Sequence, residues 1–178
     1  ADAGDGLRSC ASAPCRVHVL LEAPGVIALF KPPGVTSQDL RDQLSAALGA
    51  GGRADDVALA SRLDANTSGV IPMALGSDRS GATQWLRVQF AARQVSKEYV
   101  GLCTGEPLGS VGSEGSIDDP LLVGEWDCRG PRVVPSPLGK EARTGYHVLE
   151  VFPVVGGGTV LTLLLLRPRT GRTHQIRA

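Results

Sequence analysis

The segment Ser61–Leu75 reads SRLDANTSGVIPMAL and joins a polar, charged loop directly to an apolar run. Arg62 and Asp64 flank a single leucine, so their side chains point to the same side of an extended backbone. Asn66 and the residues after it favour turns, whereas Val70–Leu75 has the apolar character of a buried strand. The segment therefore predicts an ionised carboxylate at the rim of a hydrophobic core. On its own, Arg-x-Asp beside a strand is typical of a surface ion pair with little energetic weight.

The residues before this segment predict two short strands and a rigid turn. Val17–Glu22 and Val26–Phe30 are mainly apolar and are separated by Ala-Pro-Gly. The second strand leads into Lys31–Gly34, which reads KPPG and predicts a turn with a lysine at its mouth. After the loop, Val70–Leu75 is expected to form a strand whose Pro72 favours an edge or irregular position.

Two helices are predicted, each after residues that can cap its first turn. The first spans Gln38–Leu48 and ends before a glycine, and the second spans roughly Gly81–Arg93. Leu86 lies on the inner stripe of the second helix, and Trp85 is expected to pack against the same core. The candidate caps are Thr36 or Ser37 for the first helix, and Ser77 or Asp78 for the second.

The second half of the chain predicts mainly strands. Lys97–Leu102 alternates between two faces, and Gly105–Gly115 is a loop rich in glycine and serine. A long strand from Thr144 to Phe152 and a strand at Thr159–Arg167 flank the turn Gly156–Gly158, which predicts an antiparallel hairpin.

Length and charge limit the kinds of protein to which this chain can belong. The chain has 178 residues, which suits one domain with a sizeable core, and its formal net charge is zero. The charge is unevenly distributed, however, because eight Lys/Arg and two acids lie from Arg129 onward, against ten and sixteen before it. The second part is therefore basic enough to meet phosphates.

The sequence gives little support for a membrane-spanning protein, a metal site or disulfide bonds. No run of eighteen apolar residues occurs, so no transmembrane helix is expected. The four cysteines form no Cys-x-x-Cys pair, and the histidines show no ligand spacing to them. Cys10 and Cys15 could close a small loop or join a metal site, but free thiols are favoured. We expect a soluble intracellular protein, and cytoplasm and organelle (mitochondrion or plastid) both stay open.

Four motifs in order resemble the signatures of the RluA-type RNA pseudouridine synthases. They are KPPG at Lys31–Gly34, RLD with TSG within Arg62–Gly69, the Lys-x-Tyr of Lys97–Tyr99, and TGRTHQIR at Thr170–Arg177. The resemblance implies an α+β catalytic domain over residues 17–178, with a long, mainly antiparallel sheet flanked by helices. Residues 1–16 are expected to form a loose tail. The implied activity is isomerisation of uridine to pseudouridine in structured RNA, either rRNA or tRNA, without cofactor or metal.

The resemblance also implies roles for individual residues. Asp64 is the catalytic carboxylate, which acts after the target base has been flipped out of its helix. Tyr99 lies against that base, and Arg177 is the cationic partner of the aspartate. Arg62 is suited to hold the vacated place or the phosphates. The further candidate RNA-binding residues are Lys97, Arg172 and His174 within the motifs, and Arg129, Arg132 and Lys140 in the basic stretch.

Two departures from the family pattern leave an alternative open. Ser61 stands where the family usually has histidine, and the family domain continues beyond a motif that here ends one residue before Ala178. The C-terminal part of the domain is expected to be absent from this sequence, and a neighbouring chain could complete it. The alternative function is a non-catalytic RNA-binding scaffold in a ribonucleoprotein such as a ribosome. Near-neutral charge favours the scaffold, whereas Asp64, Tyr99 and the Arg177 motif together favour the enzyme.

Overall fold

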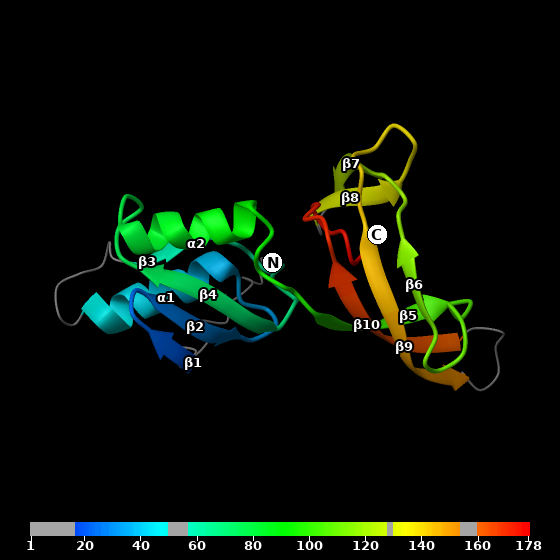
Figure 1. Cartoon of the computed structure of the whole chain (residues 1–178), viewed down its shortest axis with the longest axis horizontal. Helices are drawn as coiled ribbons and strands as arrows, with labels where there is room; N and C mark the ends of the chain where they lie inside the picture. Colours follow the sequence, from blue (N-terminus) through cyan, green and yellow to red (C-terminus); the bar gives the residue numbers. More distant parts are fainter. Residues whose placement is uncertain (1–16, 50–56, 128–129, 154–159) are drawn as a thin grey trace, which may run out of the picture. The chain divides into compact units, whose positions relative to one another are not determined.

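The structure is a computed structural model that describes residues 17–49, 57–127, 130–153 and 160–178 (Figure 1). The predicted tail, 1–16, lies outside the described residues, as does the predicted glycine turn, 156–158. The chain divides into two compact units, which we call unit 1 (Ala1–Ala92) and unit 2 (Arg93–Ala178). One catalytic domain over 17–178 stays a prediction.

Unit 1 contains a four-stranded antiparallel sheet in the order β1-β2-β4-β3 (Figure 1). The predicted strands before and after the polar loop are confirmed. The strands are β1 (His18–Ala23), β2 (Val26–Lys31), β3 (Val57–Leu59) and β4 (Gly69–Leu75).

Of the two positions predicted for Pro72, on an edge strand or at an irregular place, the edge strand is wrong for β4 as a whole. β4 is central, because it pairs with β2 on one side and β3 on the other. Pro72 lies opposite Ala28 of β2, while β3 ends with Leu59 opposite Met73. The proline therefore sits where the pairing on its second side has stopped among the described residues, which explains why a central strand tolerates it.

Two helices cover opposite faces of the unit 1 sheet (Figure 1). They are α1 (Ser37–Gly49) and α2 (Gly81–Ala91). Adjacent residues of a strand point to opposite faces, and Met73 packs with Leu40 of α1 whereas Ala74 packs with Leu86 of α2. Trp85 is 56% exposed, so its predicted place in the core is wrong. It precedes the buried Leu86 by one position, about 100° away around the helix.

A capping box starts α1, as one of the two predicted caps allows. The Thr36 hydroxyl accepts a hydrogen bond from the Asp39 backbone N–H at 3.0 Å. The Asp39 carboxylate accepts in return from the Thr36 N–H at 3.2 Å and from its hydroxyl at 2.6 Å. Thr36 is therefore the cap, and Ser37 is free to act elsewhere.

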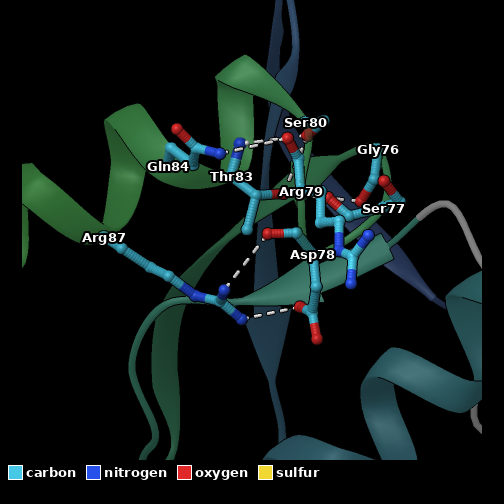
Figure 2. Close-up of polar contacts among 8 residues, drawn as sticks. All are labelled: Gly76, Ser77, Asp78, Arg79, Ser80, Thr83, Gln84 and Arg87. Atoms are coloured by element: carbon cyan, nitrogen blue, oxygen red, sulfur yellow. Dashed lines mark hydrogen bonds and ion pairs between the residues drawn. The ribbon is translucent and has the colours of Figure 1, made fainter.

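The cap of α2 is Ser80 rather than the predicted Ser77 or Asp78 (Figure 2). The Ser80 hydroxyl accepts from the Thr83 N–H at 3.2 Å and donates to the Thr83 hydroxyl at 3.0 Å. The buried Thr83 hydroxyl donates in turn to the Ser77 carbonyl at 2.9 Å. Gly76 has φ +142°, and a Cβ there would lie 2.5 Å from the Ser80 hydroxyl. The turn before α2 therefore needs glycine beside its cap.

Unit 2 contains a four-stranded antiparallel sheet in the order β5-β10-β9-β6, and a separate hairpin of β7 and β8 (Figure 1). The predicted strand at Lys97–Leu102 and the predicted pair of long strands are confirmed as β5, β9 and β10. The strands are β5 (Tyr99–Gly105), β6 (Glu114–Ile117), β7 (Leu121–Asp127), β8 (Gly130–Pro135), β9 (Thr144–Pro153) and β10 (Val160–Pro168).

The two faces of the four-stranded sheet in unit 2 differ. One face carries the buried cluster of Val148, Leu164 and Leu166, and Tyr99 and Ile176 pack against it. The other face carries apolar side chains open to solvent, such as Val100 at 67% exposure. With two helices and antiparallel sheets, the predicted α+β class is confirmed. None of the described helices is long and apolar enough to cross a membrane.

Candidate active site

The loop that carries Asp64 leads into the central strand of unit 1. The Thr67 N–H donates to the Asp64 carbonyl at 3.0 Å, which closes a tight turn over Ala65 and Asn66. The Asp64 side chain is partly buried, and that of Arg62 is exposed. This places the carboxylate at the edge of the unit 1 core, as the sequence predicted.

Lys31 ties this loop to the KPPG turn. Its side chain is 0% exposed, and its ammonium donates three hydrogen bonds to backbone carbonyls. The acceptors are Pro32 at 3.0 Å, Val35 at 2.6 Å and Ala65 at 2.8 Å. An ammonium group has three N–H bonds, so all of its donors are satisfied. The Ala65 carbonyl also accepts from the Gly34 N–H at 2.9 Å.

The charge of Lys31 lies close enough to Asp64 to interact with it. Burial lowers the pKa of Lys31 below its usual value, because the charged form loses its hydration. The Asp64 carboxylate acts in the opposite direction and raises the pKa of the lysine. The carboxylate therefore stabilises the charged form of the buried lysine.

Ser37 holds the residue just before Asp64. Its hydroxyl accepts from the Leu63 N–H at 3.0 Å and donates to the Leu63 carbonyl at 3.1 Å. The serine is 3% exposed and lies in the first turn of α1. The backbone on both sides of Asp64 is thus fixed, by α1 on one side and by the KPPG turn on the other.

In unit 2, the Lys-x-Tyr strand meets the C-terminal motif. Tyr99 and Ile176 pack against the same buried cluster. The Lys97 ammonium lies 3.9 Å from the position that a Cβ on Gly171 would occupy. Lys97, Tyr99 and Arg172 are partly buried, and Arg177 is exposed. The structure therefore brings two motifs, about seventy positions apart in the sequence, to one face of the sheet.

Two side chains of the C-terminal motif contact backbone carbonyls outside the motif, and a third contacts a side chain within it. Arg172 Nε donates to the Glu141 carbonyl at 2.7 Å. His174 has φ +50°, and its Nδ1 lies 3.0 Å from the Pro131 carbonyl oxygen. Arg177 Nη2 lies 3.2 Å from the same ring nitrogen. Arg172 and His174, predicted to bind RNA, thus also anchor this turn.

The predicted basic stretch is described in part. Arg132 and Lys140 are exposed, as a phosphate-binding surface requires, and Arg129 lies outside the described residues. Arg143, in the same stretch, makes an ion pair with Asp118 at 3.4 Å.

Sequence reasoning missed Ser37 and Gln175, and treated Lys31 only as part of a turn. Each has at least one partner that is 26 or more positions away in the sequence, which no local pattern reveals. For Lys31 and Gln175 the sequence offers only the residue type and its position. The lysine ends an apolar strand, and the glutamine lies between His174 and Ile176. Among the described residues, no group of three or more His, Cys, Asp or Glu side chains could hold a metal ion.

Comparison with known proteins identifies one family. The model of the family described as RNA pseudouridylate synthase matches residues 25–178, which is most of the chain. This match includes all four motifs.

Similar proteins in bacteria carry names of the same kind. The dual-specificity RNA pseudouridine synthase RluA of Salmonella typhi is 37% identical over 116 residues, which cover 65% of this chain and 48% of the relative. The protein of the same name from Haemophilus ducreyi is 36% identical over 118 residues, 66% of this chain and 49% of that one. The ribosomal large subunit pseudouridine synthase C of Vibrio vulnificus is 35% identical and covered over 33% of its length. The chain spans half or less of the length of these relatives.

Two solved human structures share the fold. Human RNA pseudouridylate synthase domain containing 4 superposes with a TM-score of 0.63 at 25% identity, over 90% of this chain and 62% of that one. Human RNA pseudouridylate synthase domain containing 1 gives a TM-score of 0.71 at 24% identity, over 93% and 64%.

Proposed function

The chain belongs to the RNA pseudouridylate synthase family, in agreement with the RluA-type resemblance of its motifs, and we propose that it converts uridine to pseudouridine in structured RNA. The reaction is an isomerisation. The bond from ribose C1′ to uracil N1 breaks, the base rotates, a bond from C1′ to C5 forms, and the proton on C5 is exchanged for one on N1. No atom is gained or lost, so no co-substrate is needed.

Asp64 is the proposed catalytic residue. Its carboxylate attacks the ribose or acts at the 2′ position, and detaches the base. The single observation that supports this assignment is that Lys31 and Ser37 form hydrogen bonds with the backbone on either side of Asp64. A catalytic group that must meet a flipped nucleotide benefits from such a fixed backbone, because misplacement by about 1 Å can cost 10²-fold in rate.

Tyr99 and Arg177 are the proposed partners of the aspartate in unit 2. The tyrosine ring gives the flipped base a flat face, a contact worth about 1–3 kcal/mol in related single-strand systems. Arg177 takes the role that the family motif gives to this position, that of the cation which serves the catalytic carboxylate. Both roles are carried over from the family on matching motif positions.

Binding of the RNA is proposed to rest on cations. Arg62 takes the place that the flipped base leaves, and the remaining cations bind phosphates. The proposed substrate class is rRNA or tRNA, and the name of the Vibrio vulnificus relative, a ribosomal large subunit pseudouridine synthase, supports the first of these. The proposed phosphate-binding residues are Lys97, Arg129, Arg132, Lys140, Arg172 and His174.

Mass spectrometry of cellular RNA tests the proposal. Pseudouridine in rRNA and tRNA would be mapped in cells with and without the full-length protein, and in cells that carry its Asp64→Asn variant. We expect the same pseudouridine sites to be lost in cells without the protein and in cells that carry the Asp64→Asn variant. Unchanged pseudouridine, together with association of the protein with a ribonucleoprotein, would instead favour a non-catalytic scaffold.

A further inference from the structure

The segment 169–178, which carries Arg177, contains bends and turns but neither helix nor strand. Its position therefore depends on side-chain contacts and a few backbone bonds. Ile176 anchors it to the apolar cluster of unit 2, and the Arg169 N–H donates to the Arg143 carbonyl at 2.9 Å. Gln175, between His174 and Ile176, makes the largest set of polar contacts in this segment.

All four hydrogen bonds of the Gln175 side chain cross between chain segments or close the turn. Oε1 accepts from the Thr170 hydroxyl at 2.8 Å and from the Arg172 N–H at 2.9 Å. Nε2 donates to the Arg143 carbonyl at 3.0 Å and to the Thr144 hydroxyl at 2.9 Å. The Thr170 hydroxyl accepts in addition from the Arg143 N–H at 2.9 Å, so the contacts form a closed ring.

Of an amide, a carboxylate and a methionine side chain, only the amide at position 175 satisfies all of these hydrogen-bond partners. A backbone N–H can only donate and a carbonyl can only accept, so Arg172 fixes where the side-chain oxygen lies and Arg143 fixes where the nitrogen lies. Thr144 and Thr170 are both 7% exposed, so water has little access to replace a missing partner. A carboxylate at position 175 would place an oxygen against the Arg143 carbonyl, and a methionine would remove a partner from both threonines.

We propose that Gln175 is a positioning residue for the reaction, which locks the turn 170–177 onto the start of β9 and so sets the place of Arg177. The inference rests on the proposed function, because that function gives Arg177 its part in the reaction. It adds a residue that touches neither the base nor the reacting atoms. The hydrogen-bond ring joins the start of β9, where Thr144 pairs with Pro168, to the turn that follows β10.

The test compares Gln175→Glu and Gln175→Met with Gln84→Glu in the full-length protein. Gln84 is an exposed glutamine of α2 whose amide donates to the Arg79 carbonyl at 3.2 Å, so it controls for a new acid (Figure 2). Single-turnover pseudouridine formation, RNA affinity and hydrogen exchange of residues 169–178 are measured for each. Both Gln175 variants are expected to slow the reaction by about 10- to 100-fold, with RNA affinity within about threefold of wild type.

A double variant separates positioning from general structure. Arg177→Lys is expected to slow the reaction, and adding Gln175→Glu to it is expected to cause little further decrease, because both changes act through Arg177. A decrease that multiplies with the Arg177→Lys effect, or a rate within twofold of wild type, would overturn the proposal.

Hydrogen exchange tests the effect of Gln175 on the turn without depending on turnover. Faster exchange of residues 169–178 in Gln175→Glu, but not in Gln84→Glu, is expected whether or not the protein turns over. Unchanged exchange would overturn the positioning role. Failure of the proposed function would look different, because wild type and Asp64→Asn would then form equally little pseudouridine.

Discussion

The Lys31 ammonium lies 2.8 Å from the carbonyl oxygen of Ala65, the residue that follows Asp64 in the chain. A lysine that is 0% exposed is costly unless its charge is compensated. Here three carbonyls and a nearby carboxylate compensate it, and two of the carbonyls belong to Pro32 and Val35, within and just after the KPPG turn. The turn therefore holds the loop that carries Asp64 through a cation.

Replacing Lys31 by Met is expected to destabilise unit 1 by about 1–3 kcal/mol, since the partly buried Pro32 and Val35 carbonyls lose the donor that the structure gives them and the Ala65 carbonyl keeps only the Gly34 N–H. Urea unfolding followed by circular dichroism measures this. Lys140→Met, which removes an exposed lysine, is the matched control and is expected to change stability little. Equal stability of the two variants would contradict the role assigned to Lys31.

Asp39, in the capping box of α1, predicts an acid-dependent stability. Hydrogen bonds from the Thr36 hydroxyl and the Thr36 N–H hold the pKa of the Asp39 carboxyl below its ordinary value. A carboxyl with a lowered pKa in the folded state stabilises the fold above its unfolded pKa, and this contribution is lost as the pH falls through the folded pKa. The melting temperature of wild type is therefore expected to exceed that of Asp39→Asn at neutral pH, and the gap is expected to close in acid. A gap independent of pH would refute the charge-assisted cap.

Replacing Ser80 by Ala removes the cap of α2 (Figure 2) and is expected to cost about 0.5–2 kcal/mol. Ser77→Ala is the control, because Ser77 accepts the bond from Thr83 through its backbone carbonyl, which alanine retains. Thermal unfolding distinguishes the two variants. If Ser77→Ala proved the more damaging, α2 would start earlier than the structure indicates.

Both helices and the longer strands could be predicted from the sequence, because they leave periodic patterns and end at breakers. The strands β3 and β6 and the hairpin of β7 and β8 were not predicted, because β3 and β6 are short and the hairpin contains glycines and prolines. The start of α2 could not be predicted with the same accuracy. Ser77, Asp78 and Ser80 can all cap a helix, and the choice depends on Thr83, which bonds back to the turn.

The candidate site was predictable only where a motif carries it. Asp64, Tyr99 and Arg177 come from the resemblance, whereas the contacts of Lys31 and Gln175 join positions about thirty residues apart. Such contacts depend on how strands pair, which composition and periodicity do not specify.

Arg132 and Lys140 are expected to contribute to RNA affinity by binding phosphates. Reversing both charges to Glu is expected to weaken binding and to reduce the slope of log affinity against log salt by about 0.7–0.9 for each phosphate that the protein no longer binds. Filter binding over a series of salt concentrations gives the slope. Arg79→Glu, an exposed arginine of unit 1, is the control. An unchanged slope would place the RNA on another surface.

The most direct test of the central claim is single-turnover formation of pseudouridine by Asp64→Asn, with Asp78→Asn as the control for an exposed aspartate. The substitution removes the carboxylate charge while leaving the volume of the side chain almost unchanged. We predict that Asp64→Asn binds RNA within a few-fold of wild type but forms no detectable pseudouridine, whereas Asp78→Asn behaves as wild type. A near-normal rate for Asp64→Asn would contradict the assignment of Asp64 as the catalytic residue.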